Sequence, residues 1–254
     1  MLVTFSGGLD SAFVLKVARD VLGRALVKAV TADSEALSRS DLETAKKIAL
    51  EFDVEHKIVQ TNELDDERYK SNPEIRCYFC KSGLYKAVYP VAQEWKLNTI
   101  VNGTHVDDLS DFRPGLIAAD EHGIKSPLVE AQLTKEEIRQ FSRELGLSIW
   151  DKPSSPCLSS RFPYGHEITP YKLKQVETGE EHLRNLGFKV MRLRHFDSKA
   201  RVELGHDEFV RVTEVELRNQ ITEFILSLGF KTVIFEPYRS GRLNEEAGLK
   251  HETA

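Results

Sequence analysis

The stretch Ser6-Gly7-Gly8-Leu9-Asp10-Ser11 decides the predicted fold, because it joins an apolar run at residues 2–5 to an amphipathic segment at residues 11–22. The run predicts a strand and the segment predicts a helix. Two glycines at such a junction let the backbone approach a ligand, and the N–H groups and dipole of the helix favour an anion. The hydroxyls of Ser6 and Ser11 add donors, while Asp10 is suited to position a metal or cap the helix. We therefore predict a phosphate-binding loop, with an ordinary glycine turn as the alternative.

The same alternation of strand and helix continues along the first half of the chain. A helix is also expected to begin with a capping box at Thr134 and Glu137 and to end at Gly146. Strands that alternate with helices predict a parallel sheet covered on both faces, with ligands beyond the carboxyl ends of the strands. The further predicted strands are residues 26–31, 54–60 and 99–102, and the further predicted helices are 41–52 and 80–95.

A long loop rich in Pro and Ser at residues 148–168 separates this pattern from a second one. Loops of this length in compact domains are usually functional. The similar phrases at residues 186–189 and 228–231 are either a weak internal repeat or two similar helix ends. We expect an α/β domain at residues 1–150, an active-site loop at 151–166 and a small α+β domain for substrate binding or oligomerisation at 167–254. Its predicted helices are 169–186 and 214–228, and its predicted strands are 189–194, 200–204 and 232–236.

The composition is that of a globular protein, with 41% hydrophobic and 30% charged residues. No run approaches the roughly 18 apolar residues of a membrane helix, and the start lacks the regions of a secretion signal, so a cytoplasmic location is expected. A net charge of -5 does not favour binding to nucleic acid. The three cysteines are expected to be ligands or reactive thiols rather than disulfides.

The hexapeptide at residues 6–11 resembles the PP-loop of the ATP pyrophosphatases, which cleave ATP between its α and β phosphates. It is not a Walker P-loop, since no Gly-Lys-Ser/Thr is present. Nearly the whole chain resembles the LarE family. Four further stretches carry this resemblance: Gly103-Thr104-His105-Val106-Asp107-Asp108, Asp111-Phe112-Arg113-Pro114-Gly115, Ser126-Pro127-Leu128-Val129-Glu130 and Pro156-Cys157-Leu158-Ser159-Ser160-Arg161-Phe162-Pro163-Tyr164-Gly165.

The resemblance implies an enzyme that adenylates a carboxylate of a pyridinium-3,5-dicarboxylate mononucleotide and converts it to a thiocarboxylate, on the way to the nickel-pincer nucleotide of lactate racemase. ATP, Mg²⁺ and sulfide or another sulfur donor are the implied reactants. Asp10 is expected to take part in catalysis. Asp107 and Asp108 are either Mg²⁺ ligands or part of a solvated turn. The predicted ATP-binding residues are Ser6, Gly7, Gly8, Asp10, Ser11 and Ser34.

Cys157 matches the cysteine that some family members sacrifice as their sulfur source, becoming dehydroalanine. This chain also has Cys77 and Cys80 in a C-x-x-C arrangement. Three thiolates suit a [4Fe–4S] cluster with one open iron, which can hold a sulfide. We predict this cluster, as in the three-cysteine relatives of the family. The alternatives are a redox dithiol, a zinc site completed by Cys157 and His105, and inert buried thiols.

Arg192 and Arg194 alternate with Leu193 along a predicted strand, so both point to one face. Paired guanidinium groups suit a substrate phosphate or carboxylates, and Arg161 beside Cys157 is expected to act similarly. The alternative for each is an exposed surface arginine. Glu203 matches a family position, and this resemblance alone implies a role as a metal ligand. Residues 238–242 either cover the site or form a basic tail.

Together these features predict a PP-loop sulfurtransferase that forms homo-oligomers. A tRNA thiolase and an amidating PP-loop enzyme are the alternative enzymes, although the chain shows no zinc module, basic RNA platform or glutaminase region. The alternative that is not an enzyme is a nucleotide sensor or a metal chaperone that binds ATP without turnover.

Overall fold

The computed structural model describes residues 1–110 and 112–249, so Asp111 of the quoted motif lies outside the described residues. The chain divides into two compact units. The first unit contains Met1–Glu63 and Ile75–Ser155, and the second contains Leu64–Glu74 and the described residues from Pro156 onward. No helix of the described residues is long and apolar enough to cross a membrane.

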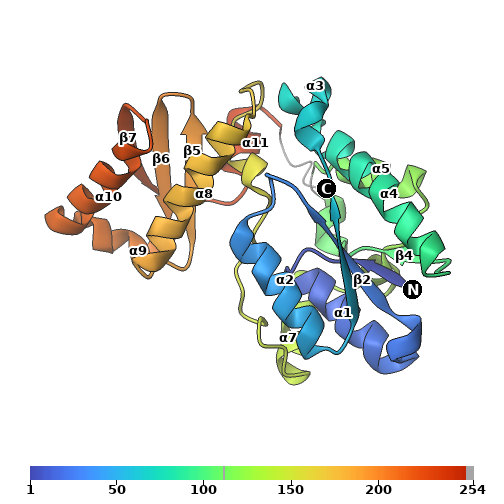
Figure 1. The fold of residues 1–254 in the computed structure, drawn as a ribbon. Coiled ribbons are helices and arrows are strands. Elements are labelled where there is room, and N and C mark those ends of the chain that lie inside the picture. Colours follow the sequence, from blue (N-terminus) through green and yellow to red (C-terminus); the bar gives the residue numbers. More distant parts are fainter. Residues whose placement is uncertain (111, 250–254) are drawn as a thin grey trace. The chain divides into compact units, whose positions relative to one another are not determined.

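The first unit is built on a four-stranded sheet in the order β3-β2-β1-β4 (Figure 1). Every pair of neighbouring strands in it is parallel, which confirms the α/β prediction. The carboxyl end of the central strand β1 therefore lies beside the carboxyl ends of β2 and β4. The strands are β1 (Leu2–Thr4), β2 (Lys28–Asp33), β3 (Glu55–Gln60) and β4 (Ile100–Val101).

Helices cover both faces of this sheet, with α1, α2 and α7 on one side and α4 and α5 on the other (Figure 1). Val3 of β1 belongs to the core beneath the first group, and its neighbour Leu2 belongs to the core beneath the second. This alternation explains why the strand reads as continuously apolar. The helices are α1 (Leu9–Leu22), α2 (Arg39–Glu51), α4 (Arg76–Glu94), α5 (Gly115–Glu121), α6 (Pro127–Glu130) and α7 (Lys135–Glu144), with 3₁₀ turns at Arg24–Leu26, Glu63–Asp65 and Val106–Ser110.

Helix α4 begins at Arg76, four residues earlier than predicted, and contains Pro90. Cys77 and Cys80 therefore both lie in its first turns, on the same helix. The predicted capping box of α7 is confirmed, because Thr134 and Glu137 each accept a hydrogen bond from the other's backbone N–H. The short helices α5 and α6 were not predicted, since segments of that length show little periodicity.

The second unit contains a three-stranded sheet in the order β5-β6-β7. Strands β5 and β6 are antiparallel, whereas β6 and β7 are parallel. The strands are β5 (Met191–Phe196), β6 (Lys199–Leu204) and β7 (Thr232–Pro237). The helices are α3 (Glu67–Lys70), α8 (Pro170–Asn185), α9 (His206–Phe209), α10 (Val215–Ser227) and α11 (Arg242–Glu246), with 3₁₀ turns at Leu158–Arg161 and Val210–Thr213.

The two faces of this small sheet differ in character. Leu193 of β5 and Val202 of β6 belong to the apolar core, which also includes Leu183 of α8 and Ile225 of α10. The intervening positions of the same strands carry charged side chains that are nevertheless buried: Arg192, Arg194, Arg201 and Glu203. Because side chains alternate along a strand, one face of the sheet forms the core and the other carries a buried ionic network.

Residues 64–74 leave the first unit and join the second. The hydroxyl groups of Tyr69 and Ser159 lie 2.5 Å apart, and Nδ2 of Asn72 donates to the carbonyl of Pro163 at 2.7 Å. The observed boundary also falls between Ser155 and Pro156, inside the predicted active-site loop. The three-part division of the sequence analysis stays a prediction.

Candidate functional site

The predicted PP-loop lies between β1 and α1, at the carboxyl end of the central strand. Gly7 has a φ of +73°, and Gly8 is the N-cap residue of α1. The Oγ atoms of Ser6 and Ser11 are 3.3 Å apart, and Oγ of Ser11 donates to the carbonyl of Gly8 at 3.1 Å. The loop thus gathers two hydroxyl groups at a helix N-terminus, which is the arrangement that binds phosphate.

Two glycines allow neighbouring backbone to approach this loop. A Cβ atom on Gly7 would lie 2.8 Å from the carbonyl oxygen of Asp41 in α2. One on Gly103, just beyond β4, would lie 2.7 Å from the backbone nitrogen of Ser11. Real Cβ contacts are longer than this, so both positions require glycine. Gly103 belongs to one of the motifs quoted from the sequence, and the close backbone of Ser11 explains why this position needs glycine.

Asp10 forms an ion pair with Lys135, the first residue of α7. Ser34 follows the carboxyl end of β2, and its Oγ accepts a hydrogen bond from the backbone of Ala36 at 3.3 Å. The sheet order places the ends of β1 and β2 beside each other. The ATP-binding and catalytic roles of these residues stay predictions. The sequence did not indicate the contact between Lys135 and Asp10, because a lysine in the first turn of a helix resembles any exposed charged residue.

The carboxylates of Asp107 and Asp108 already have protein partners. Oδ2 of Asp107 accepts a hydrogen bond from the backbone of Lys135 at 2.7 Å. Oδ1 of Asp108 lies 2.8 Å from a guanidinium nitrogen of Arg113, and 3.5 Å from Nε2 of His105. These contacts tie the segment after β4 to α7. A role of the two aspartates in Mg²⁺ binding stays a prediction.

The three cysteines are thiols, and none of them is buried. Cys77 and Cys157 are exposed and Cys80 is partly exposed, so the interpretation as inert buried thiols is wrong. Sγ of Cys80 lies 3.7 Å from Oε1 of Glu63. Within the part of the chain that the structure describes, no group of three His, Cys, Asp or Glu side chains is placed to hold a metal ion. The cluster, the zinc site and the redox dithiol stay predictions.

Arg192 and Arg194 are buried, with 6% and 7% of their surface exposed, so the interpretation as surface charge is wrong. Nε of Arg194 donates to Oε2 of Glu203 at 2.8 Å, and its NH1 donates to the carbonyl of Ser160 at 2.9 Å. The guanidinium of Arg192 stacks over the ring of Tyr238 at 5.3 Å. Burial lowers the pKa of both arginines.

Arg161 connects the cysteine-bearing loop to helix α8. Its guanidinium pairs with Glu180 in a fork, with two N–O distances of 2.8 Å. The remaining nitrogen, NH1, donates to the carbonyls of Pro156 and Cys157 at 2.7 and 3.1 Å. Arg161 therefore fixes the backbone at Cys157. Glu180 was missed, because a glutamate in a helix resembles any solvated one until its burial is seen.

Glu203 is fully buried at 0% exposure and lies among three arginines. Besides Arg194, its carboxylate lies 3.2 Å from Nε of Arg201 and 3.3 Å from NH1 of Arg242. The assignment of Glu203 as a metal ligand stays a prediction. Tyr238 and Arg242 of the predicted covering segment thus contact Arg192 and Glu203 within the second unit.

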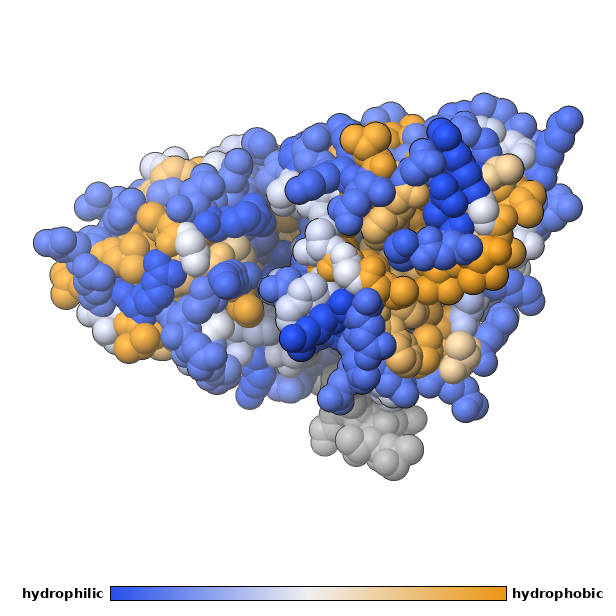
Figure 2. Space-filling view, turned by 90° about the horizontal axis from the view of Figure 1, so that it is seen from below, coloured by the Kyte–Doolittle hydropathy of each residue, from blue (hydrophilic) through white to orange (hydrophobic). Residues whose placement is uncertain are grey.

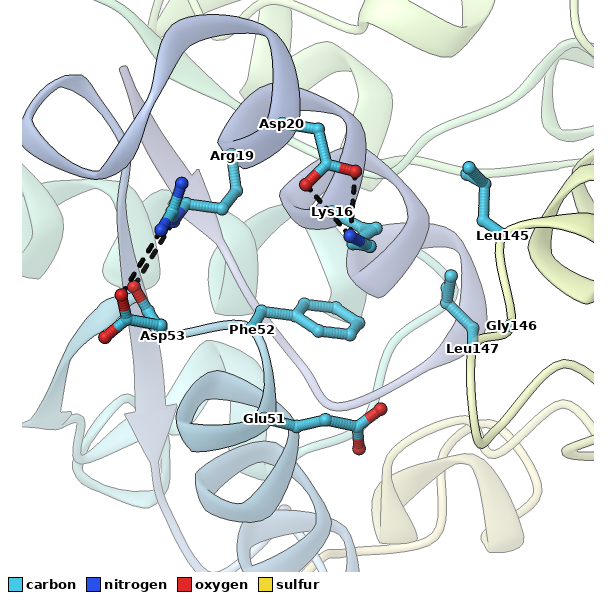
Figure 3. A pocket seen from close by; sticks show the side chains of 9 residues that line it. All are labelled: Lys16, Arg19, Asp20, Glu51, Phe52, Asp53, Leu145, Gly146 and Leu147. Carbon is cyan, nitrogen blue, oxygen red and sulfur yellow. Dashed lines mark hydrogen bonds and ion pairs between the residues drawn. The ribbon is translucent and has the colours of Figure 1, made fainter.

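A separate cavity of about 390 Å³ lies in the first unit, at the C-terminal ends of α1 and α2 (Figure 3). Its charges are paired locally: Lys16 with Asp20 at 2.8 Å and Arg19 with Asp53 at 3.2 Å. Helices that follow parallel strands end at the opposite edge from the strands' carboxyl ends, so this cavity is not the predicted ATP site.

Comparison with known proteins identifies the family of the chain. Residues 1–71 match the family described as queuosine biosynthesis protein QueC. An uncharacterized protein of Synechocystis sp., slr1717, is 45% identical over 96% of this chain and 91% of its own. The pyridinium-3,5-bisthiocarboxylic acid mononucleotide synthase of Lactiplantibacillus plantarum, the LarE enzyme, is 37% identical over 96% of this chain and 88% of its own. The chain belongs to the LarE family.

Membership of the LarE family makes the protein an ATP-dependent sulfurtransferase enzyme, which favours catalysis over the sensor or chaperone alternative. A probable tRNA sulfurtransferase of Methanobrevibacter smithii is also similar, at 29% identity, but the match covers only 35% of this chain and 24% of that protein. The similarity to a tRNA-modifying enzyme is therefore partial, whereas the similarity to LarE extends over both units.

The surface carries apolar patches among hydrophilic residues, as the face in Figure 2 shows. The most exposed large apolar side chains include Val21, Leu50 and Val215, at 75%, 82% and 68%. Homo-oligomer formation and a cytoplasmic location stay predictions.

Proposed function

We propose that the chain adenylates a carboxylate of a pyridinium-3,5-dicarboxylate mononucleotide and then introduces sulfur at the activated carbon. The observation that carries this proposal is the buried arginine group of the second unit. Arg161, Arg192 and Arg194 are buried in the same unit as Cys157. The relative from L. plantarum is named for a bisthiocarboxylic acid mononucleotide, which is the corresponding sulfur-containing product.

The clustering of guanidinium groups in this unit favours an anionic substrate. Arg161, Arg192, Arg194 and Arg201 are buried, and the carboxylates that pair with Arg161, Arg194 and Arg201 include Glu180, Glu203 and Glu246. Several guanidinium groups in one unit favour an anion with several charges, because they can form charge-assisted hydrogen bonds with it. A mononucleotide with two carboxylates is an anion of this kind, because its phosphate and both of its carboxylates are negatively charged.

The reaction needs activation because a carboxylate resists attack by nucleophiles at neutral pH. A carboxylate oxygen of the substrate attacks the α phosphorus of ATP, and pyrophosphate leaves. A sulfur nucleophile then forms a bond to the acyl carbon, and the bond from that carbon to the AMP oxygen breaks. The PP-loop residues Ser6, Gly8 and Ser11 hold the phosphates, and a bound Mg²⁺ would offset their charge.

The proposed source of sulfur involves Cys77, Cys80 and Cys157. The first two lie three positions apart in α4, so they share a helix face, and none of the three thiols is buried. Their number and accessibility fit three ligands of a [4Fe–4S] cluster. Such a cluster keeps one iron open for an added sulfide. Arg161 would hold the backbone of the third ligand through the carbonyl of Cys157.

Three measurements test the proposal. Purified protein should release pyrophosphate and AMP from ATP only when the dicarboxylate mononucleotide is present, and mass spectrometry should show oxygen replaced by sulfur in the product. Formation of ADP and orthophosphate would contradict it. Protein purified without oxygen should contain about four irons per chain. Sulfur transfer by iron-free protein, with conversion of Cys157 to dehydroalanine, would exclude the cluster and establish the sacrificial route.

A further inference from the structure

The carbonyl of Gly7 in the PP-loop accepts a hydrogen bond from a charged side chain. Nζ of Lys152 lies 2.9 Å from this carbonyl oxygen and 2.9 Å from Oδ1 of Asp41. Both side chains are largely buried, with 19% and 15% of their surface exposed. The ammonium group thus bridges the loop between β1 and α1 to the first turn of α2.

Asp41 is held by several donors besides Lys152. Oδ2 accepts hydrogen bonds from Ser38 at 2.7 Å and from Ser155 at 2.9 Å. Burial alone would raise the pKa of Asp41, but Lys152 and these hydroxyl groups outweigh it and the pKa lies below its usual value. The carboxylate therefore stays ionised at neutral pH and keeps the ammonium group in place.

This contact fixes the direction of a phosphate-binding N–H group. In a planar trans peptide the carbonyl and the following N–H point in opposite directions. When Lys152 holds the carbonyl of Gly7, the N–H of Gly8 must point to the other side, where it donates to Oγ of Ser6 at 3.4 Å. Glycine at φ +73° has little conformational preference of its own, so an outside contact is needed to select one orientation.

We propose that Lys152 and Asp41 are positioning residues of the ATP site, which hold the Gly7–Gly8 peptide with its N–H group toward the phosphates. The inference rests on the proposed function only in taking the PP-loop as the ATP site. Asp41 also anchors Ser155, and Cys157 follows shortly along the chain. One carboxylate therefore fixes both the phosphate loop and the start of the segment that leads to the sulfur-transfer cysteine.

The test is a comparison of ATP and adenosine affinities by calorimetry in K152M, K152R and D41N. In K152M the Kd of ATP should rise about tenfold, as expected for a lost charge-assisted hydrogen bond, while the Kd of adenosine stays unchanged. K152R should recover part of the loss, because arginine can still donate to the Gly7 carbonyl. D41N combined with K152M should weaken ATP binding no further than K152M alone, since the two residues act through one contact.

The matched control is K16M, which removes a lysine that pairs with Asp20 at a similar distance in the same unit. K16M should bind ATP as the wild type does. An unchanged ATP affinity in K152M would overturn the proposal, as would equal losses of ATP and adenosine affinity together with a lowered melting temperature. Pyrophosphate release is measured separately. Its absence in the wild type would refute the proposed function, while the ATP affinities would still decide the role of Lys152.

Discussion

Arg194 and Glu203 form a buried ion pair across the antiparallel strands β5 and β6, with Nε 2.8 Å from Oε2. They are not directly opposite, since Arg192 faces Glu203 and Arg194 faces Arg201 in the register. The guanidinium of Arg192 lies over the ring of Tyr238, and its NH1 donates to the carbonyl of Met191 at 2.6 Å. The two arginines on this face of β5 are therefore held by different partners.

Replacement of Arg194 should weaken substrate binding without affecting ATP. In Arg194→Ala the affinity for the mononucleotide should fall about ten- to a hundredfold, because charge-assisted hydrogen bonds contribute about 1.5–3 kcal/mol. Arg194→Lys should restore only part of it, since an ammonium group does not reproduce the fork of donors. Calorimetric titration with each ligand gives both affinities. Arg184→Ala, at an exposed position of α8, is the control. Unchanged substrate affinity in Arg194→Ala would leave Arg194 a purely structural residue.

The two glycines of the PP-loop should respond differently to substitution. A Cβ on Gly8 meets only the Oγ of Ser6, at 3.3 Å, so Gly8→Val should keep its melting temperature and lose pyrophosphate release. Gly7→Ala places a side chain at φ +73° against the backbone of Asp41. A left-handed conformation alone costs about 1–2 kcal/mol, so Gly7→Ala should melt several degrees lower. Wild-type pyrophosphate release by Gly8→Val would contradict the PP-loop assignment.

The cysteine substitutions should separate the two routes of sulfur transfer. If a cluster supplies the sulfur, Cys77→Ala, Cys80→Ala and Cys157→Ala should each lose iron and sulfur transfer. All three should still form the adenylate, because the residues predicted to bind ATP include none of the cysteines. Iron content, pyrophosphate release and product mass are the readouts.

A fully active Cys77→Ala variant would exclude the cluster. The sacrificial route would then require a mass loss at Cys157 after a single turnover. Ser154→Ala, in the same loop as Cys157, serves as the control for loop substitutions.

His195 should make the stability of the protein depend on pH. Burial lowers its pKa from 6.5 to about 4, and its Nε2 lies 3.0 Å from Oε1 of Gln175. The unfolded chain takes up a proton below pH 6.5 that the folded chain does not take up until about pH 4. Above pH 6.5 the titration of His195 therefore leaves the free energy of unfolding unchanged. This free energy falls by on the order of 2 kcal/mol as the pH decreases toward 4, because the unfolded chain is then protonated at this residue and the folded chain is not.

Denaturant unfolding between pH 4 and 7 measures this dependence. His195→Asn should lower stability at neutral pH and flatten the slope over this range. His206→Asn, at an exposed position, should leave the slope as in the wild type. Equal slopes in wild type and His195→Asn would refute the prediction.

The sequence predicted the parallel sheet and the helices that follow its strands well, because their apolar periodicity is regular. It located Arg192 and Arg194 on one face, since alternation along a strand is geometric. It did not reveal Glu180, Lys135 or Lys152, whose importance lies in partners that are far away in the chain. Lys152 and Gly7, for instance, are 145 residues apart. Nor did it assign Tyr69, whose partner Ser159 belongs to a different sequence pattern.

The passage of residues 64–74 into the second unit has a consequence for synthesis on the ribosome. Tyr69 is made 90 residues before Ser159. At translation rates of about 5–20 residues per second, this short segment waits roughly 5–20 s before its partner exists. During that interval Tyr69, only 2% exposed in the finished protein, cannot form its contact with Ser159. Because the rest of the second unit begins at Pro156, this unit can close only after most of the chain has been synthesised.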